Sequence, residues 1–191
     1  MAIKFVISKV IPSVLLFITL IILTILIDYI FHQFGFVWIG RYLGFVGTLL
    51  IILSFIYSLR KRKLISSGSP KKLLQNHEFL GWFGALMILV HGGIHFNAVI
   101  PWLALFSMLV VVASGLTGKY LLNNAKESLK KKKTELIDST LSTEEMEKEL
   151  LFNSLLVDSM QKWRKVHMPL TMIFAAFALL HIIITILLWR W

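Results

Sequence analysis

The chain has 191 residues, of which 57% are hydrophobic and only 16% charged, and its mean hydropathy is +0.78. About a quarter of the residues of a soluble domain are charged, so the composition excludes a soluble globular enzyme. The absence of cysteine excludes disulfides, thiolate zinc sites, cysteine-ligated iron–sulfur clusters and covalently attached c-type haem. The composition therefore indicates an integral membrane protein.

Five apolar segments are long enough to cross about 30 Å of hydrocarbon as helices. In chain order they cover residues 10–31, 36–57, 77–96, 102–122 and 167–189. We interpret the first as a retained anchor rather than a signal peptide, because its apolar stretch is long and no A-x-A-like cleavage site follows. The predicted fold is all-α, an integral membrane helical bundle with five transmembrane helices.

The polar segment before the last span has a helical pattern of its own. Ser142 and Glu145 have the spacing of a capping box, and apolar residues follow at helical intervals from Met146 to Trp163. This amphipathic helix could lie on the inner membrane surface, cover the cytoplasmic end of the bundle or bind a partner. The predicted organisation is an anchor helix at 1–35, spans two to four at 36–122, a cytoplasmic loop with the amphipathic helix at 123–166, and span five at 167–191.

Basic residues predict the orientation in the membrane. Apart from Arg41 and Arg190, the 20 Lys and Arg residues precede the first span, lie between spans two and three, or lie between Lys119 at the end of span four and Lys165 before span five. The positive-inside rule then places the N-terminus and both long loops in the cytoplasm, and the C-terminus outside. We expect a multi-pass protein of a bacterial inner membrane. The basic excess is a topology signal and a contact for anionic lipids; we expect no binding of nucleic acid.

Histidines within the spans carry the clearest functional signal, because ionisable residues in a membrane are expensive and usually functional. The intervals 91 − 77 and 181 − 167 both equal 14 residues. This spacing puts His77 and His91 on one helix face, and His167 and His181 on another, each pair about 21 Å apart along the axis. Spans three and five run in the same direction, so His77 would lie level with His167, and His91 with His181. Two such pairs of facing imidazoles are the ligand set of two bis-histidine haems in a four-helix core.

Other interpretations of the histidines remain open. Any one of them could cap a span or hydrogen-bond a neighbouring helix, and His91 with His95, four residues apart, could chelate a divalent metal. His95 also shares the face of His77, five turns away, but lies one turn nearer the surface and loses the match with His181. We therefore expect His91 as the ligand and His95 as a contact of a haem propionate or a quinone.

Small and basic residues give weaker support. Five glycines lie in the second and fourth spans: Gly40, Gly44, Gly47, Gly115 and Gly118. Small residues let a planar macrocycle, or simply another helix, come close. Arg41 outside and Lys119 inside could pair with haem propionates, and snorkelling to the membrane surface is the alternative interpretation.

With histidines 14 residues apart on two like-directed spans separated by one span, the chain resembles the membrane cytochromes b. The arrangement is similar to that in respiratory bc-complex cytochrome b and in the membrane domain of ferric reductases and NADPH oxidases. The segment WRKVHMPL, followed by LLHII, resembles the fifth span of small bacterial b-type cytochromes. The resemblance covers residues 36–189 and implies that His77, His91, His167 and His181 ligate two b-type haems.

The chain departs from these families in two ways. The 191 residues contain no Pro-Glu-Trp-Tyr quinol motif, and we expect no C-terminal flavin and nicotinamide domain. We therefore expect it to exchange electrons with a quinone (menaquinone or ubiquinone) or with other redox subunits or cytochromes, as the membrane subunit of a quinone-linked oxidoreductase. The alternatives are a histidine-based proton or divalent-metal transporter and a non-catalytic membrane anchor subunit.

Overall fold

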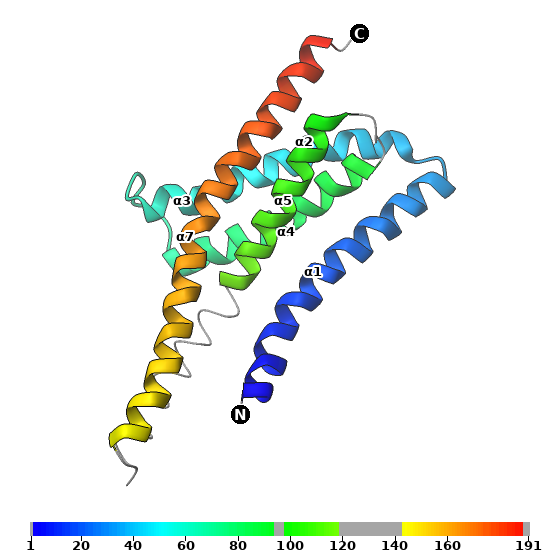
Figure 1. Ribbon diagram of the computed structural model, residues 1–191. Coiled ribbons are helices and arrows are strands. Elements are labelled where there is room, and N and C mark those ends of the chain that lie inside the picture. The colour runs from blue at the N-terminus through cyan, green and yellow to red at the C-terminus, as the bar shows by residue number, and fades with distance from the viewer. Residues whose placement is uncertain (1, 94–97, 119–142, 189–191) are drawn as a thin grey trace. The chain divides into compact units, whose positions relative to one another are not determined.

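The computed structural model describes residues 2–93, 98–118 and 143–188 (Figure 1). Their helices are α1 (Ala2–Gln33), α2 (Val37–Ser54), α3 (Ile56–Lys61), α4 (Pro70–Gly93), α5 (Val99–Thr117) and α7 (Thr143–Leu188). These residues contain no strand. Five stretches in the described part are long and apolar enough to cross a membrane: Ile11–Gln33, Val37–Lys61, Pro70–Gly93, Val99–Leu116 and Lys165–Leu188. The prediction of an all-α protein with five membrane-spanning helices is confirmed.

Helix α4 begins seven residues before the predicted start of the third span. Ser69 is its N-cap: the backbone N–H of Lys72 donates to Ser69 Oγ at 3.3 Å, and that of Leu73 donates to Ser69 O at 3.1 Å. Pro70 is the first helical residue, where its missing N–H and fixed φ cost nothing. His77 consequently lies about two turns inside the helix rather than at its end.

The second span is interrupted at Phe55, between α2 and α3. Ser54 Oγ donates back to Ile51 O at 2.7 Å, and the backbone N–H of Phe55 donates to Ile52 O at 3.0 Å. Bonds over three residues tighten the helix, and a serine bonded back to its own helix bends it. The interruption falls where α2 faces His77.

Helix α7 is a single helix of 46 residues. It joins the predicted amphipathic segment to the fifth span without a break, so the predicted boundary at 166/167 is not a helix end. On the stretch before the span, Lys162 Nζ lies 2.8 Å from Asp158 Oδ2, one turn away. The hydrogen bond to Asp158, together with its charge, raises the pKa of this exposed lysine.

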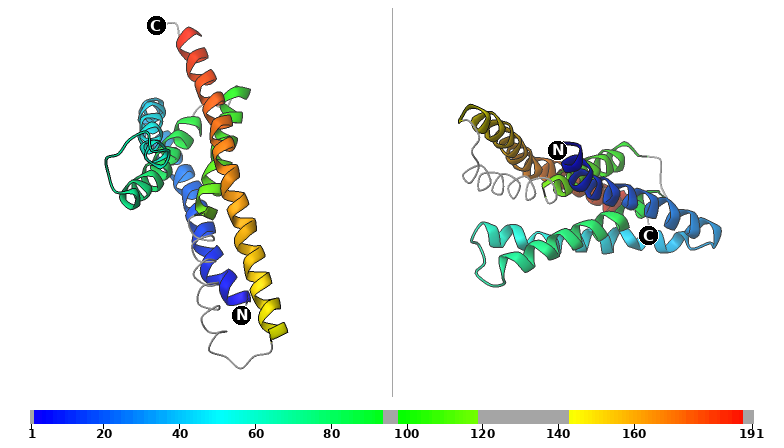
Figure 2. Two further views of the ribbon diagram at one scale, coloured as in Figure 1. Left: turned by 90° about the vertical axis from the view of Figure 1, so that its left-hand side faces the viewer. Right: turned by 90° about the horizontal axis from the view of Figure 1, so that it is seen from below.

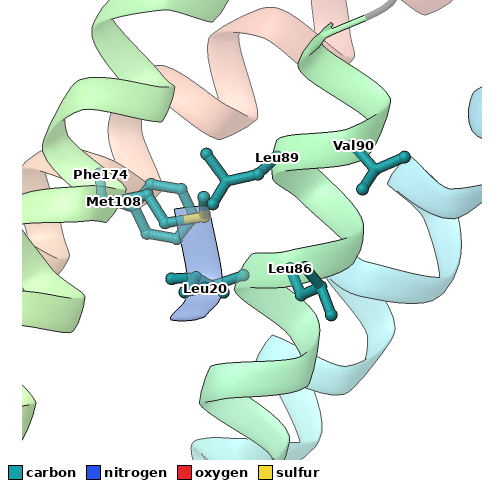
Figure 3. Packing of buried hydrophobic residues seen from close by; sticks show 7 residues of the cluster. Leu20, Leu86, Leu89, Val90, Met108 and Phe174 are labelled. Carbon is teal, nitrogen blue, oxygen red and sulfur yellow. The ribbon is translucent and has the colours of Figure 1, made fainter. Parts of the chain in front are cut away.

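The chain forms two compact units, one of Phe17–Val112 with Thr171–Trp191 and one of Met1–Leu16 with Ala113–Leu170. The buried core of the first unit takes side chains from four helices (Figure 3): Leu20, Ala85, Leu86, Leu89, Val90, Met108 and Phe174. Most large apolar side chains elsewhere stay exposed, such as Ile25 at 64% and Phe45 at 65%. Such exposure is expected where the surrounding solvent is lipid, and the molecule is a multi-pass membrane protein in contact with lipids.

Candidate histidine site

Helices α2 and α4 lie side by side (Figure 2) and hold two histidines in equivalent settings. The buried residues of α2 are small and recur every seven residues: Gly40, Gly47 and Ser54. Seven residues are about two helical turns, so these residues form one line along α2. Helix α4 sets a second seven-residue series against this line: His77, Gly84 and His91. We call these six residues the α2–α4 seam.

Contacts along the seam bring the two backbones together. A Cβ on Gly47 would lie 2.8 Å from the carbonyl oxygen of Gly84, and one on Gly84 would lie 3.0 Å from that of Gly47. At one end of the seam His91 Nδ1 lies 3.1 Å from Gly40 O, and at the other His77 Nδ1 lies 3.0 Å from Ser54 O. Each end of the seam therefore has a hydrogen bond between a histidine Nδ1 of α4 and a backbone carbonyl of α2.

These hydrogen bonds define how each ring is presented. A carbonyl oxygen can only accept, so Nδ1 of His77 and of His91 must carry the proton and donate it. In the neutral imidazole the ring lone pair is then on Nε2, which is the nitrogen that could ligate a metal. Metal-bound histidines characteristically donate their other N–H to a carbonyl or carboxylate, which fixes the tautomer and the ring orientation.

The local structure of α2 explains why the carbonyls of Ser54 and Gly40 can accept hydrogen bonds from the histidines. The carbonyl of Ser54 is at the interruption between α2 and α3, where the regular helical hydrogen bonding ends. The ring of Tyr57, just beyond it, lies 5.5 Å from that of His77 between centroids. The carbonyl of Gly40 is in the first turn of α2 and has a second lone pair for His91.

Gly44 makes room for the ring of His91. A Cβ on Gly44 would lie 2.8 Å from Cγ and Cδ2 and 2.9 Å from Nε2 of His91. Real Cβ atoms essentially never approach other atoms this closely. The imidazole thus occupies the volume that any larger residue at position 44 would need.

The structure brings His91 and His181 together. Their ring centroids lie 6.5 Å apart, with an angle of 48° between the ring planes. His181 Nδ1 lies 3.4 Å from the hydroxyl of Thr185, one turn further along α7. The two histidines belong to the same compact unit, and their role as a pair of ligands stays a prediction.

His167 belongs to the other unit, with Ser114 as its neighbour. Ser114 Oγ and His167 Nδ1 are 3.0 Å apart, and the serine is 1% exposed. A Cβ on Gly115 would make an ordinary contact, 3.5 Å, with Cε1 of the same ring. Its predicted partner His77 lies in the first unit, so that pairing stays a prediction.

The remaining predicted residues are placed as follows. His95 and Lys119 fall outside the described residues. Arg41 follows Gly40 on α2 and is exposed, and its contact with a propionate stays a prediction. Within the described residues, no group of three or more His, Cys, Asp or Glu side chains is placed to hold a metal ion.

Sequence reasoning missed the partners of the histidines and one unusual carboxylate. The seven-residue recurrence of Gly40, Gly47 and Ser54 is visible in the sequence, but which carbonyl a histidine meets is not. Asp28 on α1 has a buried Oδ1 with no hydrogen-bond partner among the described atoms. The nearby His32 donates from Nδ1 to the backbone oxygen of Asp28 at 2.8 Å instead.

The spacing of His91 and His181 would suit two imidazoles that hold one metal ion between them. Metal–imidazole bonds of about 2.0 Å, with ring centres about 1.1 Å beyond the nitrogens, put two opposed ring centres about 6 Å apart. The observed separation is 6.5 Å. A haem takes its other four iron ligands from the porphyrin, so two protein imidazoles suffice where a bare metal ion would need more.

The described residues define the class as an all-α, multi-pass membrane protein with two histidines in contact across α4 and α7. Comparison with protein-family models, with curated proteins and with solved structures finds no match to the chain.

Proposed function

We propose that this chain is a bis-histidine, di-haem b-type cytochrome that carries electrons across a membrane, as the membrane subunit of a quinone-linked oxidoreductase complex. The observation that carries the proposal is the pair His91 and His181, 6.5 Å apart between ring centroids. It is supported by the Nδ1 hydrogen bond of His91 to Gly40 O, which presents Nε2 for ligation.

The residues of the chain would hold the haem and tune it. A b-type haem supplies an iron centre that takes up and releases one electron, and its potential depends on axial ligands, hydrogen bonding and burial. The carbonyl of Gly40 would make His91 a more basic ligand by accepting a hydrogen bond from its Nδ1–H. Because Gly44 has no side chain, the His91 ring can occupy the space beside it.

We propose a second haem because His77 on α4 has the same type of hydrogen bond as His91. His77 lies 14 residues from His91, about 21 Å along the helix, and its Nδ1 is held by a carbonyl in the same way. Its proposed partner is His167. Two haems held at these positions would have irons about 20 Å apart and porphyrin edges much closer together. The shorter distance between the edges would suit electron transfer across the membrane.

Location and partners belong to the same proposal. We place the chain in a bacterial inner membrane, and the distribution of Lys and Arg favours a cytoplasmic N-terminus and a C-terminus outside. The electron donor and acceptor would be a quinone, menaquinone or ubiquinone, and other redox subunits or cytochromes. Arg41 and Lys119 are the proposed propionate partners, and His95 a contact of a propionate or the quinone.

The test is the pigment of the purified full chain. We expect a Soret band, a b-type α band that sharpens on reduction with dithionite, and two haems per chain. His91→Ala and His181→Ala should each remove one haem. His32→Ala is the matched control, because His32 bonds to its own helix and should leave both haems in place.

A colourless preparation would contradict the proposal, as would loss of haem from His32→Ala equal to that from His91→Ala. A chain without haem whose His91→Ala variant loses bound divalent metal would favour the transporter instead.

A further inference from the structure

His167 differs from the two histidines of α4 in the atom that its Nδ1 meets. His77 and His91 face backbone carbonyls, whereas His167 faces the hydroxyl of Ser114, on another helix. A carbonyl cannot be changed by substitution, but a hydroxyl can. The Ser114 contact can therefore be removed with little change in volume.

Ser114 is placed to control the ring of His167. Its hydroxyl is 3.0 Å from Nδ1, and the residue is 1% exposed. A buried hydroxyl needs a hydrogen-bond partner, so separating Ser114 from His167 would be costly. A Cβ added to Gly115, the next residue, would lie 3.5 Å from Cε1 of the same ring. The imidazole of His167 therefore lies close to α5 at two consecutive positions.

The direction of this hydrogen bond decides whether His167 can act as a ligand. A serine hydroxyl can donate or accept. If Ser114 donates, the proton of the neutral imidazole is on Nε2, and that nitrogen cannot bind iron. If Ser114 accepts, the proton is on Nδ1 and Nε2 is the ligating atom.

We propose that Ser114 is a positioning residue whose hydroxyl oxygen accepts a hydrogen bond from Nδ1–H of His167 and so selects the tautomer in which His167 would ligate the second haem. This inference rests on the proposed function, because it assigns a partner to one of the four proposed ligands. It makes retention of the haem that His167 would ligate dependent on α5.

Helix α5 offers a matched control. Ser107 precedes Ser114 by seven residues on the same helix and is also buried, at 8% exposed. Its hydroxyl donates to Ala104 O at 2.9 Å, within α5. Ser107→Ala therefore removes a buried hydroxyl whose hydrogen bond stays within α5.

The first measurement is haem binding by the full chain. Loss of the group that orients a ligating histidine typically weakens binding 10- to 100-fold, so Ser114→Ala should lower haem content from two toward one per chain. Ser107→Ala should keep two. Equal helicity of both variants by circular dichroism would show that neither has unfolded. Two haems bound by Ser114→Ala with wild-type affinity would overturn the assignment.

The second measurement needs no haem. In the full chain purified haem-free, ¹⁵N chemical shifts of the His167 ring report which nitrogen carries the proton. We expect the proton on Nδ1 in the wild type and a mixture of tautomers in Ser114→Ala. A proton found on Nε2 in the wild type would overturn the assignment.

Different results would overturn the proposed function and the role of Ser114. A wild-type chain that binds no haem would overturn the proposed function and the assignment of Ser114 with it. A wild-type chain with two haems whose Ser114→Ala variant keeps both overturns only the assignment of Ser114.

Discussion

At the scale of single residues, a glycine is as important for the position of His91 as the hydrogen bond of the histidine itself. Gly44 has no Cβ, and the His91 ring fills the space that one would take. Thr48, one turn along, donates from Oγ1 to Gly44 O at 2.7 Å. The side chain of Thr48 is thus hydrogen-bonded to the α2 backbone at Gly44, beside the ring of His91.

Gly44→Ala should displace His91 and remove one of the two proposed haems. The new methyl group would lie within 2.9 Å of three ring atoms, and the ring must leave its hydrogen bond with Gly40 to relieve the contact. Haem per chain and the reduced spectrum measure the effect. Gly81→Ala on α4 is the control: nothing lies within 4 Å of its Cβ. That variant should keep two haems and gain up to about 1 kcal/mol of helix stability; equal haem loss in both would contradict the role of Gly44.

At the scale of elements, the α2–α4 seam positions both histidines of α4 at once. Its central contact is backbone against backbone, through Gly47 and Gly84. Helices approach this closely only where the facing residues are small. Since the hydrogen bonds of His77 and His91 lie at opposite ends of the same seam, its spacing controls both of them.

Gly47→Ala should weaken both proposed haem sites together. Its methyl group would meet Gly84 O and Ile88 Cγ1 at 2.8 Å, and the backbone oxygen can move only if the helices separate. Overpacking of this kind costs about 1–3 kcal/mol. Thermal unfolding in detergent and haem content measure the two consequences. A fall in one haem only, as for Gly44→Ala, would argue against a common seam.

The sequence predicts which histidines share a helix face but not the groups that they meet, and the reason is physical. Fourteen-residue spacing fixes that His77 and His91 share a face, because the helical period is constant. It does not identify Gly40 and Ser54 as their acceptors, since this depends on the register between two helices. The start of α4 at Pro70 was missed although Ser69 and Pro70 form a recognisable helix start, because the polar first turns of α4 fall outside an apolar run.

At the scale of the whole molecule, an odd number of spans in the described residues predicts that the two ends of the chain lie on opposite sides of a membrane. Five spans are present in the described part of the chain. The connection between α3 and α4 carries Arg62 and Lys63, and Arg60 on α3 bonds to Gly68 O at 3.3 Å across it. The positive-inside rule predicts that this connection is cytoplasmic.

Reporter fusions test this orientation. A fluorescent protein inserted after Ser66 should fold and fluoresce, as it does in the cytoplasm. Alkaline phosphatase fused after Trp191 should be active, because it requires an oxidising compartment outside. The reciprocal fusions should be inactive. Activity of the phosphatase after Ser66 would reverse the assigned orientation, without bearing on whether the chain binds haem.

The sequence by itself determined the class of protein, the five spans and the shared faces of the histidines. Hydropathy and helical period are sums over neighbouring residues, so they need no knowledge of the fold. Only the tertiary structure decided that His91 meets His181, that two carbonyls of α2 hold the histidines of α4, and that Ser114 faces His167. Each of these depends on how separate helices pack against one another, which residue spacing within one helix does not specify.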